Sequence, residues 1–118
     1  MTDYYQQSQD AIARAEDAHR RGDSETARAA YAEAATIQGA WVAMLDPSAQ
    51  PRTKSVYTAS IVALHHKAGE IDKARTLGKE ALAQPWLVGY AATRIREVLR
   101  SLPPVQQTPA LPSATVDR

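Results

Sequence analysis

The chain has 118 residues and a formal net charge of +1, and it contains no cysteine. This length suits a single domain, and the lack of cysteine excludes disulfides and thiolate chemistry. The near-neutral charge argues against a strongly basic nucleic-acid-binding protein. No run of about 18 apolar residues predicts a membrane span, and the start of the chain lacks the pattern of a secretory signal. We therefore expect a cytoplasmic protein.

The apolar residues recur at spacings of three and four, which predicts helices. Five are expected, over about residues 4–21, 24–45, 54–68, 71–83 and 87–101. Gly22 and Gly69 are expected to end the first and third helices, and Pro85 cannot continue the fourth. Ser24, at the start of the second helix, supplies half of a capping box. Residues 46–51 contain two prolines and are expected to form a loop. The sequence therefore predicts an all-α fold.

The last part of the chain has a different composition. Residues 102–118 contain four prolines and almost no charge, so they cannot bury enough surface to fold by themselves. We expect a helical domain over residues 1–101 and a disordered or polyproline-II-like tail over 102–118.

Charge is distributed unevenly between the two halves. Residues 1–50 have a net charge of −4, and residues 51–118 have a net charge of +5. This asymmetry favours steering towards a charged partner or head-to-tail self-association. A chance distribution in a short chain is the alternative interpretation.

An internal repeat relates the first two predicted helices to the third and fourth. Gly22 aligns with Gly69, and alanines follow at the same offsets: Ala27 and Ala34 in the first copy, Ala74 and Ala81 in the second. This pattern resembles the tetratricopeptide repeat (TPR), a pair of antiparallel helices with a Gly-Asp turn and small residues where the helices cross. The resemblance covers about residues 5–101.

Several features depart from the repeat pattern. The two glycines are 47 residues apart, whereas the family repeats every 34 residues or so. Val62 stands where the first copy has Ala15, and Gly78 stands where the first copy has Tyr31. The early tryptophan of the family pattern is absent from both copies. An unrelated five-helix bundle is therefore the alternative architecture.

The resemblance implies a non-enzymatic module that binds another protein or a peptide in a groove lined by the first helix of each pair. The fifth helix would cap the stack. Carried over to this chain, the expected groove residues are Gln9, Ala13, Glu16, His19 and Arg20 on the first helix, and Val56, Ser60, Ala63, His66 and Lys67 on the third.

Large apolar residues near the end of the second helix predict a second surface. Trp41, Met44 and Leu45 lie in the segment that lengthens the repeat, and an exposed apolar patch there would form an interface. The alternative function is therefore a regulatory or structural subunit that acts mainly through homo-oligomerisation, for example as a homodimer.

Other chemistry has little support in the sequence. Glu16 and His19 have the Glu-x-x-His spacing of di-iron bundles, but there is no second copy of it. No phosphate loop or nucleophile motif is present, so we expect neither catalysis nor a cofactor nor a metal. A nucleic-acid-binding regulator is the least favoured alternative, because only the fifth helix, with Arg94, Arg96 and Arg100, is basic.

Overall fold

The computed structural model describes residues 3–104, which form five α-helices and no strand. The helices are α1 (Tyr4–Arg20), α2 (Ser24–Val42), α3 (Pro51–Lys67), α4 (Ile71–Leu82) and α5 (Gly89–Ser101). The predicted all-α fold is confirmed, and each helix lies within a few residues of its predicted bounds. Among the described residues, no helix is long and apolar enough to cross a membrane. Most of the predicted tail, residues 105–118, lies outside the described residues.

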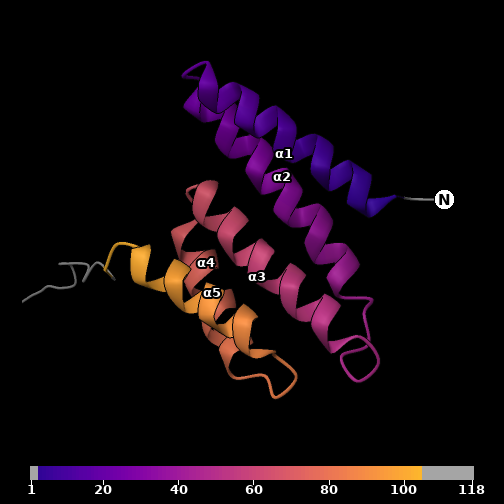
Figure 1. Cartoon of the computed structure of the whole chain (residues 1–118). Helices are drawn as coiled ribbons and strands as arrows, with labels where there is room; N and C mark the ends of the chain where they lie inside the picture. Colours follow the sequence, from indigo (N-terminus) through magenta and orange to yellow (C-terminus); the bar gives the residue numbers. More distant parts are fainter. Residues whose placement is uncertain (1–2, 105–118) are drawn as a thin grey trace, which may run out of the picture.

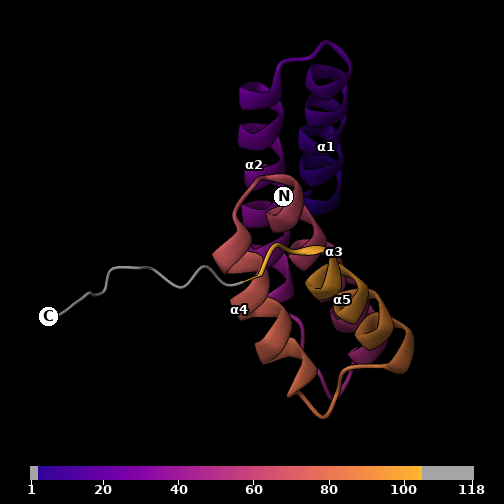
Figure 2. The same cartoon turned by 90° about the vertical axis from the view of Figure 1, so that its left-hand side faces the viewer.

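The helices form two groups that meet at α3. The antiparallel hairpin of α1 and α2 contacts the rest of the molecule through α2, which packs against α3 (Figure 1). Helix α3 in turn packs against α4 and α5, which also contact each other. Figure 2 shows the hairpin standing above the group of α3, α4 and α5. Helix α3 is therefore the central element.

The two tight turns have the same backbone structure, as the repeat predicts. Gly22 has a φ of 79°, a left-handed conformation that glycine adopts without a steric penalty. Its N–H donates to the carbonyl of His19, and the N–H of Asp23 donates to the carbonyl of Ala18. These bonds define a Schellman motif. Forty-seven residues later, Gly69 (φ 78°) and Glu70 donate in the same way to His66 and His65.

The side chains at the two turns differ in what they bind. Asp23, rather than Ser24, is the N-cap of α2, because its Oδ1 accepts from the N–H of Thr26 at 3.2 Å. The N-cap predicted at Ser24 is therefore wrong by one residue.

At the corresponding position before α4, the Glu70 side chain makes no such cap. Its carboxylate instead accepts from Nδ1 of His65 at 2.8 Å and from Nζ of Lys73 at 3.3 Å. Because a carboxylate only accepts hydrogen bonds, Nδ1 of His65 is the protonated ring nitrogen. This contact spans the turn and joins the end of α3 to the start of α4.

Helix α3 begins three residues earlier than the sequence predicted. Pro51 occupies its first turn, where the missing N–H costs nothing because such groups have no helical partner. The preceding loop is held by Asp46, whose Oδ1 accepts from the N–H and the hydroxyl of Ser48. A proline that looked like part of the loop therefore starts the helix.

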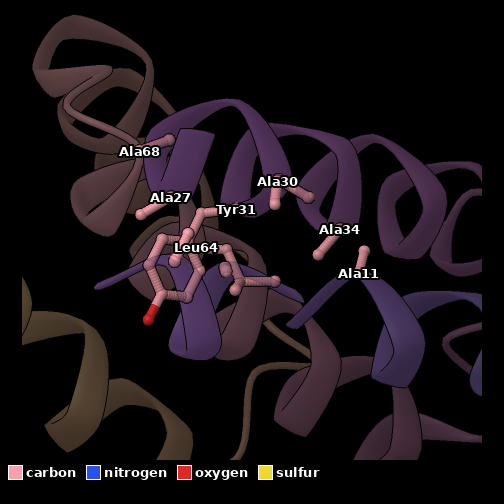
Figure 3. Packing of buried hydrophobic residues seen from close by; sticks show 10 residues of the cluster. Ala11, Ala27, Ala30, Tyr31, Ala34, Leu64 and Ala68 are labelled. Carbon is pink, nitrogen blue, oxygen red and sulfur yellow. The ribbon is translucent and has the colours of Figure 1, made fainter. Parts of the chain in front are cut away.

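Alanine dominates the core between α1 and α2. Ala11, Ala15 and Ala18 of α1 are fully buried against α2, so the two helices approach closely. The larger side chains of this cluster are Tyr31 of α2 and Leu64 of α3, which lie side by side in Figure 3. The first core is therefore completed by a residue from α3.

The second core lies between α3, α4 and α5 and contains larger side chains. Its buried members are Ala59, Val62, Ala63, Ala74, Ala81, Ala91, Ile95, Val98 and Leu102. Leu102, which the sequence placed at the start of the tail, is only 7% exposed. The described core therefore extends one residue beyond α5.

The two copies of the repeat fill equivalent positions from different helices. Tyr31 in α2 supplies its own ring to the first core. The equivalent residue in α4 is Gly78, and a Cβ built there would lie 2.9 Å from Cδ2 of Leu99 and 3.3 Å from Cγ2 of Ile95. Helix α5 therefore fills the space that an aromatic side chain fills in the first copy.

These contacts predict opposite effects for two Gly→Ala substitutions inside helices. Gly39→Ala is expected to stabilise the chain by about 0.5–1 kcal/mol, because alanine is the better helix former and a Cβ at Gly39 meets nothing within 4 Å. Gly78→Ala is expected to destabilise it by about 1–3 kcal/mol through overpacking. Denaturant titrations followed by circular dichroism measure both changes, and equal shifts of the same sign would contradict the close packing of α5 at Gly78.

The contact between Glu70 and His65 predicts a pH-dependent contribution to stability. The hydrogen bond from His65, with smaller contributions from Lys73, holds the pKa of Glu70 below its ordinary value. Such a carboxylate stabilises the fold above its unfolded pKa and loses that contribution as the pH falls through its folded pKa.

Glu70→Gln is therefore expected to cost about 0.5–1.5 kcal/mol near neutral pH. The cost should shrink as the pH falls below about 4, where the unfolded chain takes up the proton first, and it should be smallest below the lowered folded-state pKa, where Glu70 is protonated in both states. The measurement is the difference in unfolding free energy between the unchanged chain and the Glu70→Gln variant, near neutral pH and again below about pH 4. A difference that does not change with pH would show that the charge of Glu70 contributes nothing.

Candidate functional site

A groove of about 330 Å³ lies between α3 and α5, with one residue contributed by α1. Its lining residues are Ile12, Val56, Ala59, Ser60, Ala63, Leu64, Lys67, Tyr90, Ala91 and Arg94. The α3 members recur at spacings of three and four, so they share one face of that helix. The groove therefore has an apolar floor with polar groups at Ser60, Lys67, Tyr90 and Arg94.

Two large apolar side chains of this groove remain exposed. Val56 is 44% exposed and Tyr90 is 55% exposed, and both belong to the few large apolar residues on the described surface. Ala59, Ala63 and Ala91 between them are buried. An apolar depression flanked by exposed apolar side chains is typical of a surface that binds another molecule.

Ser55 positions the two walls of the groove relative to each other. This serine is fully buried, and its hydroxyl donates to the carbonyl of Trp86 at 3.3 Å and accepts from the N–H of Val88 at 3.1 Å. These bonds join the beginning of α3 to the residues that precede α5. Val56 follows Ser55 directly, and Tyr90 lies two residues after Val88. The two hydrogen bonds of Ser55 therefore place both exposed side chains at the same groove.

Both cations of the groove are exposed at its surface. Lys67 ends α3, and its Nζ lies 5.6 Å from the ring centroid of Tyr31. Arg94 lies one turn after Tyr90 on α5. Among residues 3–104, neither cation has a carboxylate oxygen within 4.0 Å, whereas Arg14 contacts Glu33 at 2.7 Å. The groove therefore presents positive charge beside an apolar surface.

Four of the ten groove residues expected from the sequence line this groove, and all four belong to α3: Val56, Ser60, Ala63 and Lys67. His66 is partly buried on α3 and does not line it. The five residues expected from α1, Gln9, Ala13, Glu16, His19 and Arg20, do not line it either; Gln9 is half-buried, and the others are exposed. Helix α1 packs on α2 rather than on α3, so it reaches the groove only through Ile12.

Sequence reasoning missed the α5 contribution. Tyr90 and Arg94 are four residues apart, a spacing that places both on one helix face, but α5 was interpreted as a cap for the stack. Their spacing was a usable signal. The role of Ser55 had no comparable signal, because its partners lie more than 30 residues away in the sequence.

The second predicted surface is partly covered within the chain. The rings of Trp41 and Tyr57 meet edge to face, with 4.5 Å between their centroids. Leu45 is half-buried, and Met44 is 63% exposed. Helix α3 therefore covers part of Trp41, and association through these residues remains a prediction.

A second hollow of about 380 Å³ lies on the opposite face of α3, between α2 and α4. Small residues line it at four-residue intervals: Ala35 and Gly39 of α2, and Ala43 directly after that helix. The only titratable side chain in its lining is that of His65, which binds Glu70. This hollow therefore lacks the exposed cations that distinguish the first groove.

The remaining sequence candidates do not converge on a chemical centre. Glu16 and His19 are both exposed on α1. Within residues 3–104, no three His, Asp or Glu side chains come together as a group that could hold a metal ion.

Comparison of the chain with known protein families, with curated proteins and with solved structures finds no match. The resemblance to tetratricopeptide repeats therefore depends on the residues and turns of this chain alone.

The position of Ser55 predicts a measurable structural role. Ser55→Ala removes the acceptor for the Val88 N–H and is expected to destabilise the chain by about 1–3 kcal/mol, because a group that was bonded loses its partner. Ser60→Ala is a matched control, since Ser60 faces the groove and makes none of these bonds. Urea denaturation compares the two variants, and equal stabilities would show that the Ser55 bonds do not hold α5 in place.

Proposed function

We propose that the chain is a non-enzymatic interaction module that binds a segment of another protein in the groove between α3 and α5. The observation that carries this proposal is the exposure of Val56 and Tyr90 on either side of an apolar floor. Burying such side chains against a partner releases about 25 cal/mol per Å² of apolar area. Both residues belong to helices, so a partner would meet a surface that is already formed.

The tetratricopeptide-like pattern supports the same proposal. In that family the first helix of each unit contributes to a concave binding surface. In this chain α3 is the first helix of the second predicted unit, and α5 follows that unit. The equal backbone structure of the Gly22 and Gly69 turns supports the repeat. The proposed module is thus a short helical repeat in which α5 forms a wall of the groove as well as covering the second core.

The test is binding of peptides selected for the whole chain from a random library of 12-residue sequences. Tyr90→Ala is expected to lower the affinity for the selected peptides by about tenfold or more, as for an aromatic hot spot. Tyr5→Ala is the matched control, because Tyr5 is 54% exposed on α1 and does not line the groove. Fluorescence anisotropy measures both affinities, with circular dichroism to confirm folding.

Two outcomes would contradict the proposal. Equal affinities of Tyr90→Ala and Tyr5→Ala for the peptides would place binding elsewhere on the molecule. If sedimentation shows a dimer that Tyr90→Ala leaves intact, and no peptide is selected, homo-oligomerisation would be the main property.

A further inference from the structure

The groove has two chemically different parts. On α3, Val56 and Lys67 are eleven residues apart, which corresponds to about 16 Å along a helix axis. Val56 and Tyr90 provide exposed apolar surface, while Lys67 and Arg94 provide positive charge. An extended segment rises about 3.3 Å per residue, so about five residues would reach from Val56 to Lys67. A segment that fits this groove therefore carries two kinds of group a few residues apart.

The two cations are available to a partner. Among the described residues, neither Lys67 nor Arg94 has a carboxylate within ion-pair distance. The ring of Tyr31 lies beneath the ammonium group of Lys67, and a cation–π contact orients a cation without neutralising it. Arg94 offers a planar guanidinium that can bind a carboxylate through two parallel hydrogen bonds.

The magnitudes decide what each part contributes. An exposed ion pair changes an affinity by about fivefold at most, whereas a buried aromatic or aliphatic anchor changes it by about ten- to 150-fold. Affinity would therefore come mainly from the apolar part. The cations would select the partner and accelerate its association, as charge complementarity does at other interfaces.

We propose that the groove binds a partner segment in which a large apolar side chain lies within a few residues of an Asp or Glu. The apolar side chain lies between Val56 and Tyr90, and the carboxylate lies at Lys67 and Arg94. This inference rests on the proposed function and specifies the chemistry of the partner.

The end of the described chain argues against an occupant from the same molecule. The carbonyl of Pro103 accepts a hydrogen bond from Arg75 of α4. Helix α4 contributes no residue to the groove, so the chain leaves α5 on the side of α4. An acidic segment from a different protein fits the charge of the groove better than this proline-rich tail, which has Asp117 as its one acidic side chain.

The test combines selection with charge reversal in the full chain. Peptides are selected from the random 12-residue library, and one of them, labelled with fluorescein, serves as the binding probe. We expect the selected peptides to be enriched in Asp or Glu within about five residues of a large apolar residue, the reach of the groove. Arg94→Glu is expected to lower the affinity for the probe by about tenfold at low salt, where charge pairs are least screened, because the reversal removes an attraction and adds a repulsion.

Arg96→Glu is the matched control. It makes the same change in net charge on the same helix, but Arg96 is exposed and does not line the groove, so the loss of affinity should stay below about twofold, the size of a screened long-range effect. A version of the probe with Lys in place of its acidic residues should bind Arg94→Glu better than the unchanged chain. This rescue cannot arise from misfolding of the variant.

Four results would overturn the inference. Selected peptides without acidic residues, or equal effects of Arg94→Glu and Arg96→Glu, would remove the acidic requirement. The proposed function would survive if Tyr90→Ala still lowered the affinity by about tenfold or more. Displacement of the probe by a synthetic peptide with the sequence of residues 105–118 would assign the groove to the chain's own tail. A dimer that is lost in Tyr90→Ala would assign it to a second copy.

Discussion

Five consecutive buried side chains, from Ile61 to His65, place α3 at the centre of the molecule. A helix that is buried on every side of one segment must be covered by neighbours on more than one face. Helix α2 supplies one neighbour, and α4 and α5 supply the others. The polar member of the run, His65, is tolerated because Glu70 accepts a hydrogen bond from its ring. The rest of the architecture follows from covering this helix.

The groove exists because this coverage is incomplete. The face of α3 that carries Val56, Ser60 and Lys67 points between α1 and α5, and neither helix closes over it. Ser55 keeps α5 close to the start of α3. The site is therefore the part of the central helix that its neighbours leave open, and its chemistry is set by the residues on that strip and on α5.

Local features of the fold could be predicted from the sequence, whereas long-range ones could not. The turns at Gly22 and Gly69 depend on the conformation of one residue and on bonds within six residues, so the sequence predicts their positions correctly, together with the presence of two helices between them. Pro51 was misplaced because a proline fits both a loop and a first helical turn. The α5 wall of the groove depends on Ser55 and on Gly78, whose partners are distant in sequence. Periodicity contains no information about such partners.

The alanine interface between α1 and α2 has a consequence for how the molecule opens. Ala11, Ala15 and Ala18 bury only methyl groups, each worth about 0.8 kcal/mol, and α1 packs on α2 alone. Because α1 packs against one helix only, a local opening that separates α1 from α2 would leave the packing among α3, α4 and α5 intact. The one contribution of α1 to the groove is Ile12. A ligand that touches Ile12 would therefore lower the rate at which α1 exchanges its amide hydrogens, and the flexibility of the hairpin would be coupled to occupancy of the groove.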